Sequence, residues 1–365
     1  MTLEIEDKKY NDKIKNLLID PNISVKEAMR QMNKAGKRIL FVVDDEERLL
    51  GSLTDGDIRR WVLSEGSLSD KVDKVYNQKP FVVTDGFDLE TVKEVMLTEQ
   101  IEWIPVINGN RRITEILFWD NIFGDGKKKL KGKVSLPVVI MAGGKGTRLD
   151  PFTRILPKPL IPIGEKAIID IIMEKFNDFG VNRFFISVNH KSKMIKAYFE
   201  ETNCKYKIDY IEEEKPLGTA GSLGFLYQKI DTDLIVSNCD IIIDCDYAEI
   251  VKFHQTNNYD ITIVASFRHF QIPYGVCTIE DGGKLLALNE KPEYDFLVNT
   301  GMYLLKKETL KLIPGGEFFH ITDLINKVVD NKCKVGVFPI DEKSWIDIGQ
   351  WEEYQKSLRD LKIES

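Results

Sequence analysis

Residues 136–149 read Leu-Pro-Val-Val-Ile-Met-Ala-Gly-Gly-Lys-Gly-Thr-Arg-Leu, and this stretch decides the fold of the second half of the chain. Its apolar start, residues 136–141, is typical of a parallel strand that is buried on both faces. The loop that follows has three glycines in four positions, so its backbone N–H groups can approach an anion closely. It has neither the ending of a Walker A loop nor the spacing of a dinucleotide-binding loop. The stretch therefore predicts a strand that leads into an anion-binding loop.

The sequence beyond this loop continues an α/β pattern. Residues 167–179 carry apolar side chains at helical spacing and precede Gly180, which predicts an amphipathic helix that ends there. Residues 184–188 and 234–236 are short apolar runs that predict further strands. Strands that alternate with helices indicate an α/β domain built on a largely parallel sheet.

A second segment, residues 157–164, reads Pro-Lys-Pro-Leu-Ile-Pro-Ile-Gly. Together the two segments resemble the signature of the sugar-phosphate nucleotidyltransferases, a G-G-x-G-T-R-L loop followed by P-K-P-L. The resemblance covers residues 135 to about 360 and implies a Rossmann-like mixed sheet flanked by helices. Members of this family make an NDP-sugar and pyrophosphate from an NTP and a sugar 1-phosphate.

That reaction joins two anions, so its site needs positive charge more than an acid–base pair. The resemblance implies that Arg148 holds the triphosphate and that Lys158 lies beside the reacting phosphates. A solvated lysine between two prolines is the alternative for Lys158. The loop residues that the resemblance assigns to the nucleotide are Ala142, Gly143, Gly144, Gly146 and Thr147.

Two acidic residues follow or interrupt apolar segments. Asp240 ends the predicted strand after residue 234, and Asp347 is an isolated acid in Trp-Ile-Asp-Ile-Gly. An acid in such surroundings is costly unless it is paired or binds a metal. The resemblance implies that Asp240 and Asp347 bind Mg²⁺, whereas helix capping is the alternative at each position.

Residues 211–221 read Ile-Glu-Glu-Glu-Lys-Pro-Leu-Gly-Thr-Ala-Gly and resemble the family's base-reading loop. The resemblance assigns Glu213, Gly218 and Thr219 to the nucleotide. A carboxylate only accepts hydrogen bonds, so Glu213 suits the N–H donors of guanine and favours GTP. A solvated acidic turn is the alternative for the neighbouring glutamates. A uridylyl-, cytidylyl- or thymidylyltransferase, or an inactive nucleotide sensor, also remains open.

Segments nearer the end of the chain resemble the sugar-binding motifs of the family. They assign Gly275, Glu290, Lys291 and Asn299 to the sugar phosphate. The combination with the N-terminal half resembles the glucosamine 1-phosphate guanylyltransferases of bacterial legionaminic acid synthesis. Glucosamine 1-phosphate and mannose 1-phosphate are therefore the expected substrates.

The N-terminal half contains a weak internal repeat. Residues 38–59 read as strand, turn, strand and helix start, and the same pattern returns later with Asp120 in the place of Asp57. The repeats resemble a tandem CBS module over residues 1–125. That resemblance implies an adenine nucleotide bound by Thr54 and Asp57, with a degenerate second site because Leu117 replaces the hydroxyl. Helix capping and dimerisation without a ligand are the alternatives.

Composition limits the class of protein. Residues 126–134 are rich in lysine and predict a solvated linker before a catalytic domain at 135–365. The net charge of −7 argues against nucleic acid as a partner. No apolar run could span a membrane, the acidic start lacks a signal peptide, and the five cysteines are scattered. We expect a cytoplasmic homo-oligomer with reduced thiols.

Overall fold

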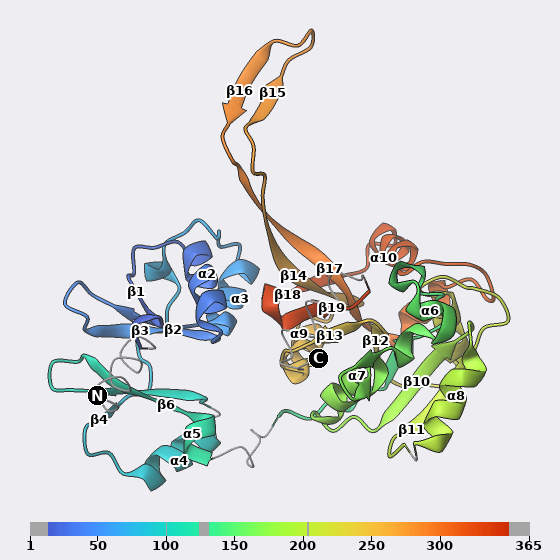
Figure 1. The fold of residues 1–365 in the computed structure, drawn as a ribbon, viewed down its shortest axis with the longest axis horizontal. Coiled ribbons are helices and arrows are strands. Elements are labelled where there is room, and N and C mark those ends of the chain that lie inside the picture. Colours follow the sequence, from blue (N-terminus) through green and yellow to red (C-terminus); the bar gives the residue numbers. More distant parts are fainter. Residues whose placement is uncertain (1–13, 100, 124–130, 203, 350–365) are drawn as a thin grey trace. The chain divides into compact units, whose positions relative to one another are not determined.

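The structure, a computed structural model, describes residues 14–99, 101–123, 131–202 and 204–349. The chain divides into two compact units, an N-terminal unit (Met1–Leu130) and a C-terminal unit (Lys131–Ser365) (Figure 1). None of the helices in the described part of the chain is both long and apolar enough to cross a bilayer. All five cysteines are free thiols.

The N-terminal unit is built from two similar repeats separated by η1 (Val72–Lys74). The first contains β1 (Leu18–Ile19), α2 (Val25–Ala35), β2 (Ile39–Val43), β3 (Leu49–Thr54) and α3 (Asp55–Leu63). The second contains β4 (Val83–Thr84), α4 (Leu89–Glu99), β5 (Trp103–Ile107), β6 (Ile113–Phe118) and α5 (Trp119–Phe123). Each repeat forms a three-stranded sheet whose first two strands are parallel and whose last two are antiparallel. The internal repeat predicted from the sequence is confirmed.

Local chemistry explains these elements. Ser24 and Glu27 form a capping box that starts α2, and Gly36 ends the helix in the left-handed conformation. In the second repeat, Leu117 is buried with Val92 and Met96 in an apolar cluster. The residue that lacks the hydroxyl therefore serves the packing of its repeat.

The C-terminal unit is built on a seven-stranded sheet flanked by helices. The strand order is β11 (Lys207–Glu212), β10 (Arg183–Val188), β7 (Val138–Met141), β12 (Leu234–Asn238), β17 (Glu293–Leu305), β14 (Ile261–Gln271) and β18 (Val335–Ile340). Strand β17 runs antiparallel to its neighbours, and the other pairings are parallel. The predicted mixed, mostly parallel α/β fold is confirmed.

Smaller elements complete this unit. The helices are α6 (Phe152–Ile155), α7 (Ile168–Asn177), α8 (Ser192–Glu201), α9 (Tyr247–Thr256) and α10 (Ile321–Asp330). The 3₁₀ turns are η2 (Thr147–Leu149), η3 (Lys158–Leu160), η4 (Gly221–Leu226), η5 (Lys307–Leu312) and η6 (Glu342–Ser344). Two-stranded pairs are β8 (Pro162–Ile163) with β9 (Lys166–Ala167), β13 (Ile241–Ile243) with β19 (Trp345–Asp347), and β15 (Val276–Ile279) with β16 (Leu285–Asn289).

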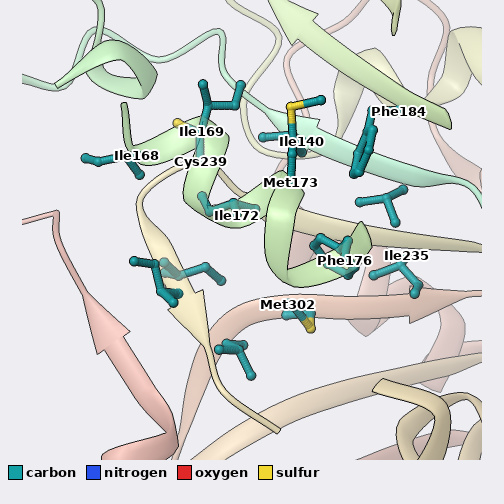
Figure 2. Close-up of a cluster of buried hydrophobic side chains, with 14 of the residues drawn as sticks. Ile140, Ile168, Ile169, Ile172, Met173, Phe176, Phe184, Ile235, Cys239 and Met302 are labelled. Carbon is teal, nitrogen blue, oxygen red and sulfur yellow. The ribbon is translucent and has the colours of Figure 1, made fainter. Parts of the chain in front are cut away.

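Both faces of the sheet carry a hydrophobic core. On β7, Ile140 belongs to one core and Val139 to the other, because successive side chains of a strand point to opposite faces. Figure 2 shows Ile172, Met173 and Phe176 of α7 in the first core. This double burial explains the continuous apolar character of the strand.

The predicted linker at 126–134 needs a correction at its C-terminal end, while residues 126–130 lie outside the described part of the chain. Lys131 forms an ion pair with Asp178 at 2.8 Å, and its ammonium lies over the Phe179 ring. Val134 is buried and its N–H donates to the Phe179 carbonyl. Residues 131–134 therefore pack on the C-terminal unit, because Val134 supplies an apolar contact that the lysine-rich composition obscures.

Strands β14 and β17 continue beyond the sheet as a two-stranded ribbon that ends in the β15–β16 hairpin (Figure 1). We refer to residues 270–297 as the arm. None of the arm residues is buried.

Candidate active site

The glycine-rich loop connects β7 to η2. Gly146 has a φ of +69°, and a Cβ there would lie 2.9 Å from Thr153 Cγ2 and 3.1 Å from Lys158 Cβ. The Thr153 hydroxyl donates to the Gly146 carbonyl at 3.1 Å. Only glycine fits this bend, which holds the loop against the Lys158 side chain. Arg148 lies in η2, directly after the loop, and is exposed.

Lys158 lies at the start of η3 and is only 9% exposed. Its Nζ contacts the Asp240 carboxylate in a buried ion pair. Desolvating two charges is tolerable when they are paired. The alternative of a solvated lysine does not fit this burial.

Asp240 and Asp347 come together because β13 pairs with β19. Ile241 lies opposite Asp347 in this antiparallel pair, and the Ile348 N–H donates to the Asp240 carbonyl at 2.8 Å. Neither acid begins an α-helix, so helix capping does not explain them.

Gly349 marks the point where the three charged groups meet. A Cβ at Gly349 would lie 2.6 Å from Asp240 Oδ2, 2.8 Å from Asp347 Oδ1 and 3.4 Å from Lys158 Nζ. The Gly349 N–H also donates to Asp347 Oδ1 at 2.7 Å. Two carboxylates and one ammonium thus surround a single point beside a residue without a side chain.

The electrostatics of this cluster favour a cation. Burial raises the pKa of Asp347, and the nearby Asp240 carboxylate adds to this, while the hydrogen bond from the Gly349 N–H and the charges of Lys158 and Arg148 oppose the shift. Two carboxylates that meet in a partly buried place suit the oxygen preference of Mg²⁺. In the described ranges no group of three or more His, Cys, Asp or Glu side chains could hold a metal. A magnesium site with two carboxylates is compatible with this, because Mg²⁺ commonly keeps water and substrate oxygens as its other ligands.

Glu213 is buried next to the glycine-rich loop, whereas Glu212 and Glu214 are exposed. Its carboxylate accepts from the Ser187 hydroxyl and from the Leu217 N–H, the latter at 3.1 Å. A Cβ at Gly143 would lie 3.0 Å from Glu213 Oε1. Glu213 therefore lies against the loop as a fixed acceptor, while its neighbours fit a solvated turn.

The rest of the predicted base-reading loop has a strong packing role. Gly218 has a φ of +78°, and a Cβ there would lie 2.6 Å from the Phe319 carbonyl oxygen. The Thr219 hydroxyl accepts from the Ile321 N–H at 2.9 Å, at the start of α10. Gly218 and Thr219 thus join this loop to α10.

The predicted sugar-phosphate residues are divided between two places. Asn299 lies beyond the root of the arm, and its amide donates to the Tyr303 hydroxyl at 2.7 Å. Gly275, Glu290 and Lys291 lie on the arm, where a Cβ at Gly275 would be 2.9 Å from Glu290 Oε2. Figure 1 shows the β15–β16 end of the arm far from β13, which directly follows Asp240, and from β19, which contains Asp347. One copy of the chain therefore does not bring these three residues to its own cluster.

In the N-terminal unit, Thr54 and Asp57 form a capping box at the start of α3. The Thr54 N–H and hydroxyl both donate to Asp57 Oδ2, at 2.8 and 2.6 Å, and the Asp57 N–H donates to the Thr54 hydroxyl. Arg60 pairs with the other carboxylate oxygen. The capping alternative therefore fits the hydrogen bonds that this pair makes.

Sequence reasoning missed two kinds of residue. Position 349 must be glycine because a Cβ there would collide with the charged side chains around it. The one hint in the sequence was that this glycine lies two residues after Asp347. Ser187 and Ser222 are fully buried, and their hydroxyls lie 3.0 Å apart. Ser187 interrupts the apolar run of β10, and the sequence could have indicated from this a polar partner nearby, because a buried hydroxyl needs a hydrogen-bond partner.

Comparison with known proteins places this arrangement in a family. Residues 137–363 match the nucleotidyl transferase family, and residues 14–64 match the CBS domain. The chain is 30% identical over 244 residues to a UTP–glucose-1-phosphate uridylyltransferase of Synechocystis, covering 61% of this chain and 63% of that protein. The chain thus spans less than two thirds of the length of that relative.

Two further relatives are matched almost over their full length. One is a D-glycero-α-D-manno-heptose 1-phosphate guanylyltransferase of Campylobacter jejuni, 27% identical over 225 residues, covering 61% of this chain and 99% of that protein. The other is the crystal structure of HddC from Yersinia pseudotuberculosis complexed with GMP-PN, 26% identical with a TM-score of 0.50, covering 62% of this chain and 99% of that one. With its glycine-rich loop and its paired lysine and aspartates, this chain belongs to the nucleotidyl transferase family.

Proposed function

We propose that the C-terminal unit transfers a nucleotidyl group from an NTP to a sugar 1-phosphate and releases pyrophosphate. The observation that carries this proposal is the meeting of Lys158, Asp240 and Asp347 at Gly349, directly beside the glycine-rich loop. Such a cluster provides one buried cation and two carboxylates for a metal, which is what the joining of two phosphate groups requires.

In the reaction, a phosphate oxygen of the sugar 1-phosphate attacks the α-phosphorus of the NTP. The bond from the α-phosphorus to the bridging oxygen breaks, and pyrophosphate leaves with that electron pair. The attacking oxygen is already ionised, so no base is needed. Lys158 provides a fixed positive charge at the reacting phosphates, and the exposed Arg148 binds the leaving pyrophosphate with its planar fork of donors. A Mg²⁺ ion held by Asp240 and Asp347 would neutralise phosphate charge.

The nucleotide favoured by this site is GTP. Ala142, Gly143, Gly144, Gly146 and Thr147 present the loop backbone to the phosphates. Glu213 accepts one internal hydrogen bond at each oxygen, which leaves each oxygen able to accept another from guanine. The Campylobacter relative is named a guanylyltransferase, and the Yersinia structure holds the guanine nucleotide analogue GMP-PN; both support this choice. The Synechocystis relative, in contrast, is named for UTP.

The second substrate is a hexose 1-phosphate, with glucosamine 1-phosphate and mannose 1-phosphate as the first candidates. Asn299 binds its hydroxyls, and Gly275, Glu290 and Lys291 bind its hydroxyls and phosphate when the arm is brought to the cluster, a position that it does not occupy in one copy of the chain. In the N-terminal unit, Thr54 and Asp57 bind an adenine nucleotide that regulates transfer.

Pyrophosphate release from the purified full-length chain tests this function. Each of GTP, UTP, CTP, TTP and ATP is incubated with each of a panel of sugar 1-phosphates, with and without Mg²⁺. We expect release only when an NTP, a sugar 1-phosphate and Mg²⁺ are all present, and fastest with GTP. Release that does not depend on the sugar phosphate would contradict the assignment, and a preference for another NTP would refute the guanine assignment alone.

A further inference from the structure

The ribbon at the base of the arm carries three aromatic rings on one face, which also bears Arg268 opposite Phe296. Tyr294 lies opposite Phe270, and Phe296 is two residues further along the same strand, so the three rings share a face. The Phe270 and Phe296 rings are 6.0 Å apart, and the Tyr294 and Phe296 rings 6.3 Å. On the opposite face, His269 binds Asp295 at 2.8 Å, and Leu297 lies two residues beyond Asp295. The three clustered rings make the first face the more aromatic of the two.

The outer hairpin of the arm also carries apolar side chains. Cys277 lies opposite Leu288, and beyond a register shift Ile279 lies opposite Leu285, so apolar side chains of the two strands face each other in pairs. The large apolar side chains of the arm are between 40% and 74% exposed: Phe270, Tyr274, Ile279, Leu285, Leu286, Leu288, Tyr294, Phe296 and Leu297. A two-stranded ribbon with an apolar face is at best marginally stable in water, so the arm needs a surface to cover it.

The described parts of this chain offer the arm little cover. Both faces of the large sheet are already filled, and no arm residue belongs to either core. In the described part of the N-terminal unit, the exposed large apolar residues are Leu63, Phe81 and Leu89, far fewer than the arm carries.

We propose that the arm packs against a second copy of this chain and carries Glu290 and Lys291 to the catalytic cluster of that copy. At about half exposure, its large side chains present on the order of 800 Å² of apolar surface. A specific interface takes about 800 Å² from each partner. A two-fold dimer buries the same face on both copies, and a second copy is the one partner that always offers a matching surface.

The catalytic domain has a receiving surface at the required place. Ile155 of α6 is 75% exposed, and Met194 of α8 is exposed nearby, since Lys191 donates to the Thr153 and Arg154 carbonyls. This apolar patch adjoins the glycine-rich loop through Thr153. An arm docked on it places Glu290 and Lys291 near a cluster that they do not reach in their own chain. This step rests on the proposed function, while the packing of the arm against a second copy does not.

Photocrosslinking tests the pairing without reference to activity. The photoreactive residue p-benzoylphenylalanine replaces Leu286 of the arm or, as a control, the exposed Val329 of α10. With the photoreactive residue at position 286, we expect covalent dimers on a denaturing gel. The yield of covalent dimers should be much lower with the photoreactive residue at position 329. It should also be much lower from position 286 when the arm carries Phe270→Glu and Phe296→Glu. Crosslinks from position 286 that stay within one chain would overturn the proposal and show that the arm folds onto its own catalytic or N-terminal unit.

Complementation tests whether the arm acts on the other copy's site. One chain carries Lys158→Ala with an intact arm, and the other carries Glu290→Ala and Lys291→Ala with an intact cluster. Each is expected to be inactive alone. After co-expression, half of the dimers are mixed and each has one complete site, so about one quarter of the wild-type activity should return. If the mixture is no more active than its components while the wild type is active, the arm does not serve the other copy.

Discussion

Replacement of Gly349 by alanine tests the geometry of the catalytic cluster with a single methyl group. The new Cβ would lie 2.6 Å from Asp240 Oδ2 and 2.8 Å from Asp347 Oδ1, which is closer than a real Cβ approaches other atoms. The φ of Gly349 is not in the left-handed region, so the backbone accepts alanine and the carboxylates must move instead. Overpacking of this kind costs about 1–3 kcal/mol of stability.

The functional cost of Gly349→Ala should exceed its structural cost. A shift of about 1 Å in a positioned group lowers turnover by about 10²-fold. If Asp240 and Asp347 share a metal, the Mg²⁺ concentration for half-maximal activity should also rise. Steady-state pyrophosphate release across a Mg²⁺ titration measures both effects, with thermal unfolding as the check on the fold.

Gly315→Ala is the matched control, because a Cβ at Gly315 meets no atom within 4 Å. It should leave turnover and the Mg²⁺ titration unchanged. A Gly349→Ala variant that has wild-type turnover and a wild-type Mg²⁺ curve would refute the convergence of the two carboxylates on one ion.

Three further predictions concern the base, a buried histidine and the N-terminal unit. Glu213→Gln places an amide donor against the N–H donors of guanine, so the preference for GTP should fall by about 1–3 kcal/mol. The ratio of kcat/KM values among the NTPs measures this preference. Unchanged ratios would mean that the Glu213 side chain does not read the base. Burial lowers the pKa of His254, whose Nδ1 lies 2.8 Å from the Thr262 hydroxyl. The neutral, buried imidazole therefore contributes its full stability above the ordinary pKa of 6.5, and this contribution is lost as the pH falls. His254→Gln should flatten the pH dependence of the urea unfolding midpoint between about pH 7 and pH 5. If the wild type and the variant show parallel plots of midpoint against pH, this prediction is wrong. Asp57→Ala should abolish the binding of adenine nucleotides to the full chain, measured by calorimetry, while Asp120→Ala should have little effect. If Asp120→Ala weakens binding more than Asp57→Ala does, or if the wild type binds no adenine nucleotide, this sensing site is excluded.

Motifs read from the sequence predicted that Lys158, Asp240 and Asp347 lie together near the glycine-rich loop. The order of the glycine-rich loop, Lys158, Asp240 and Asp347 along the chain predicted one site, and the structure brings these residues together through the β13–β19 pair. The position of α7 followed from the helical spacing of its apolar residues, and that of β7 from a continuous apolar run, which a strand buried on both faces requires.

Features that depend on tertiary placement could not be predicted in the same way. Nothing in the local pattern of Gly275, Glu290 and Lys291 distinguishes a hairpin folded onto its own domain from a projecting arm. The packing of Val134 on the C-terminal unit was hidden by the lysines around it. Gly349 is required by atoms of three distant residues, which no single segment of sequence reveals.

The most direct test of the central claim is the turnover of Lys158→Ala beside that of Lys166→Ala. Lys158 is buried against Asp240, whereas Lys166 is an exposed lysine paired with Glu174. Loss of a positioned charge at the reacting phosphates should lower pyrophosphate release by about 10²-fold or more in Lys158→Ala, with an unchanged circular dichroism spectrum. Lys166→Ala should retain wild-type turnover. Near-normal turnover in a folded Lys158→Ala variant would contradict the assignment of this cluster as the catalytic centre.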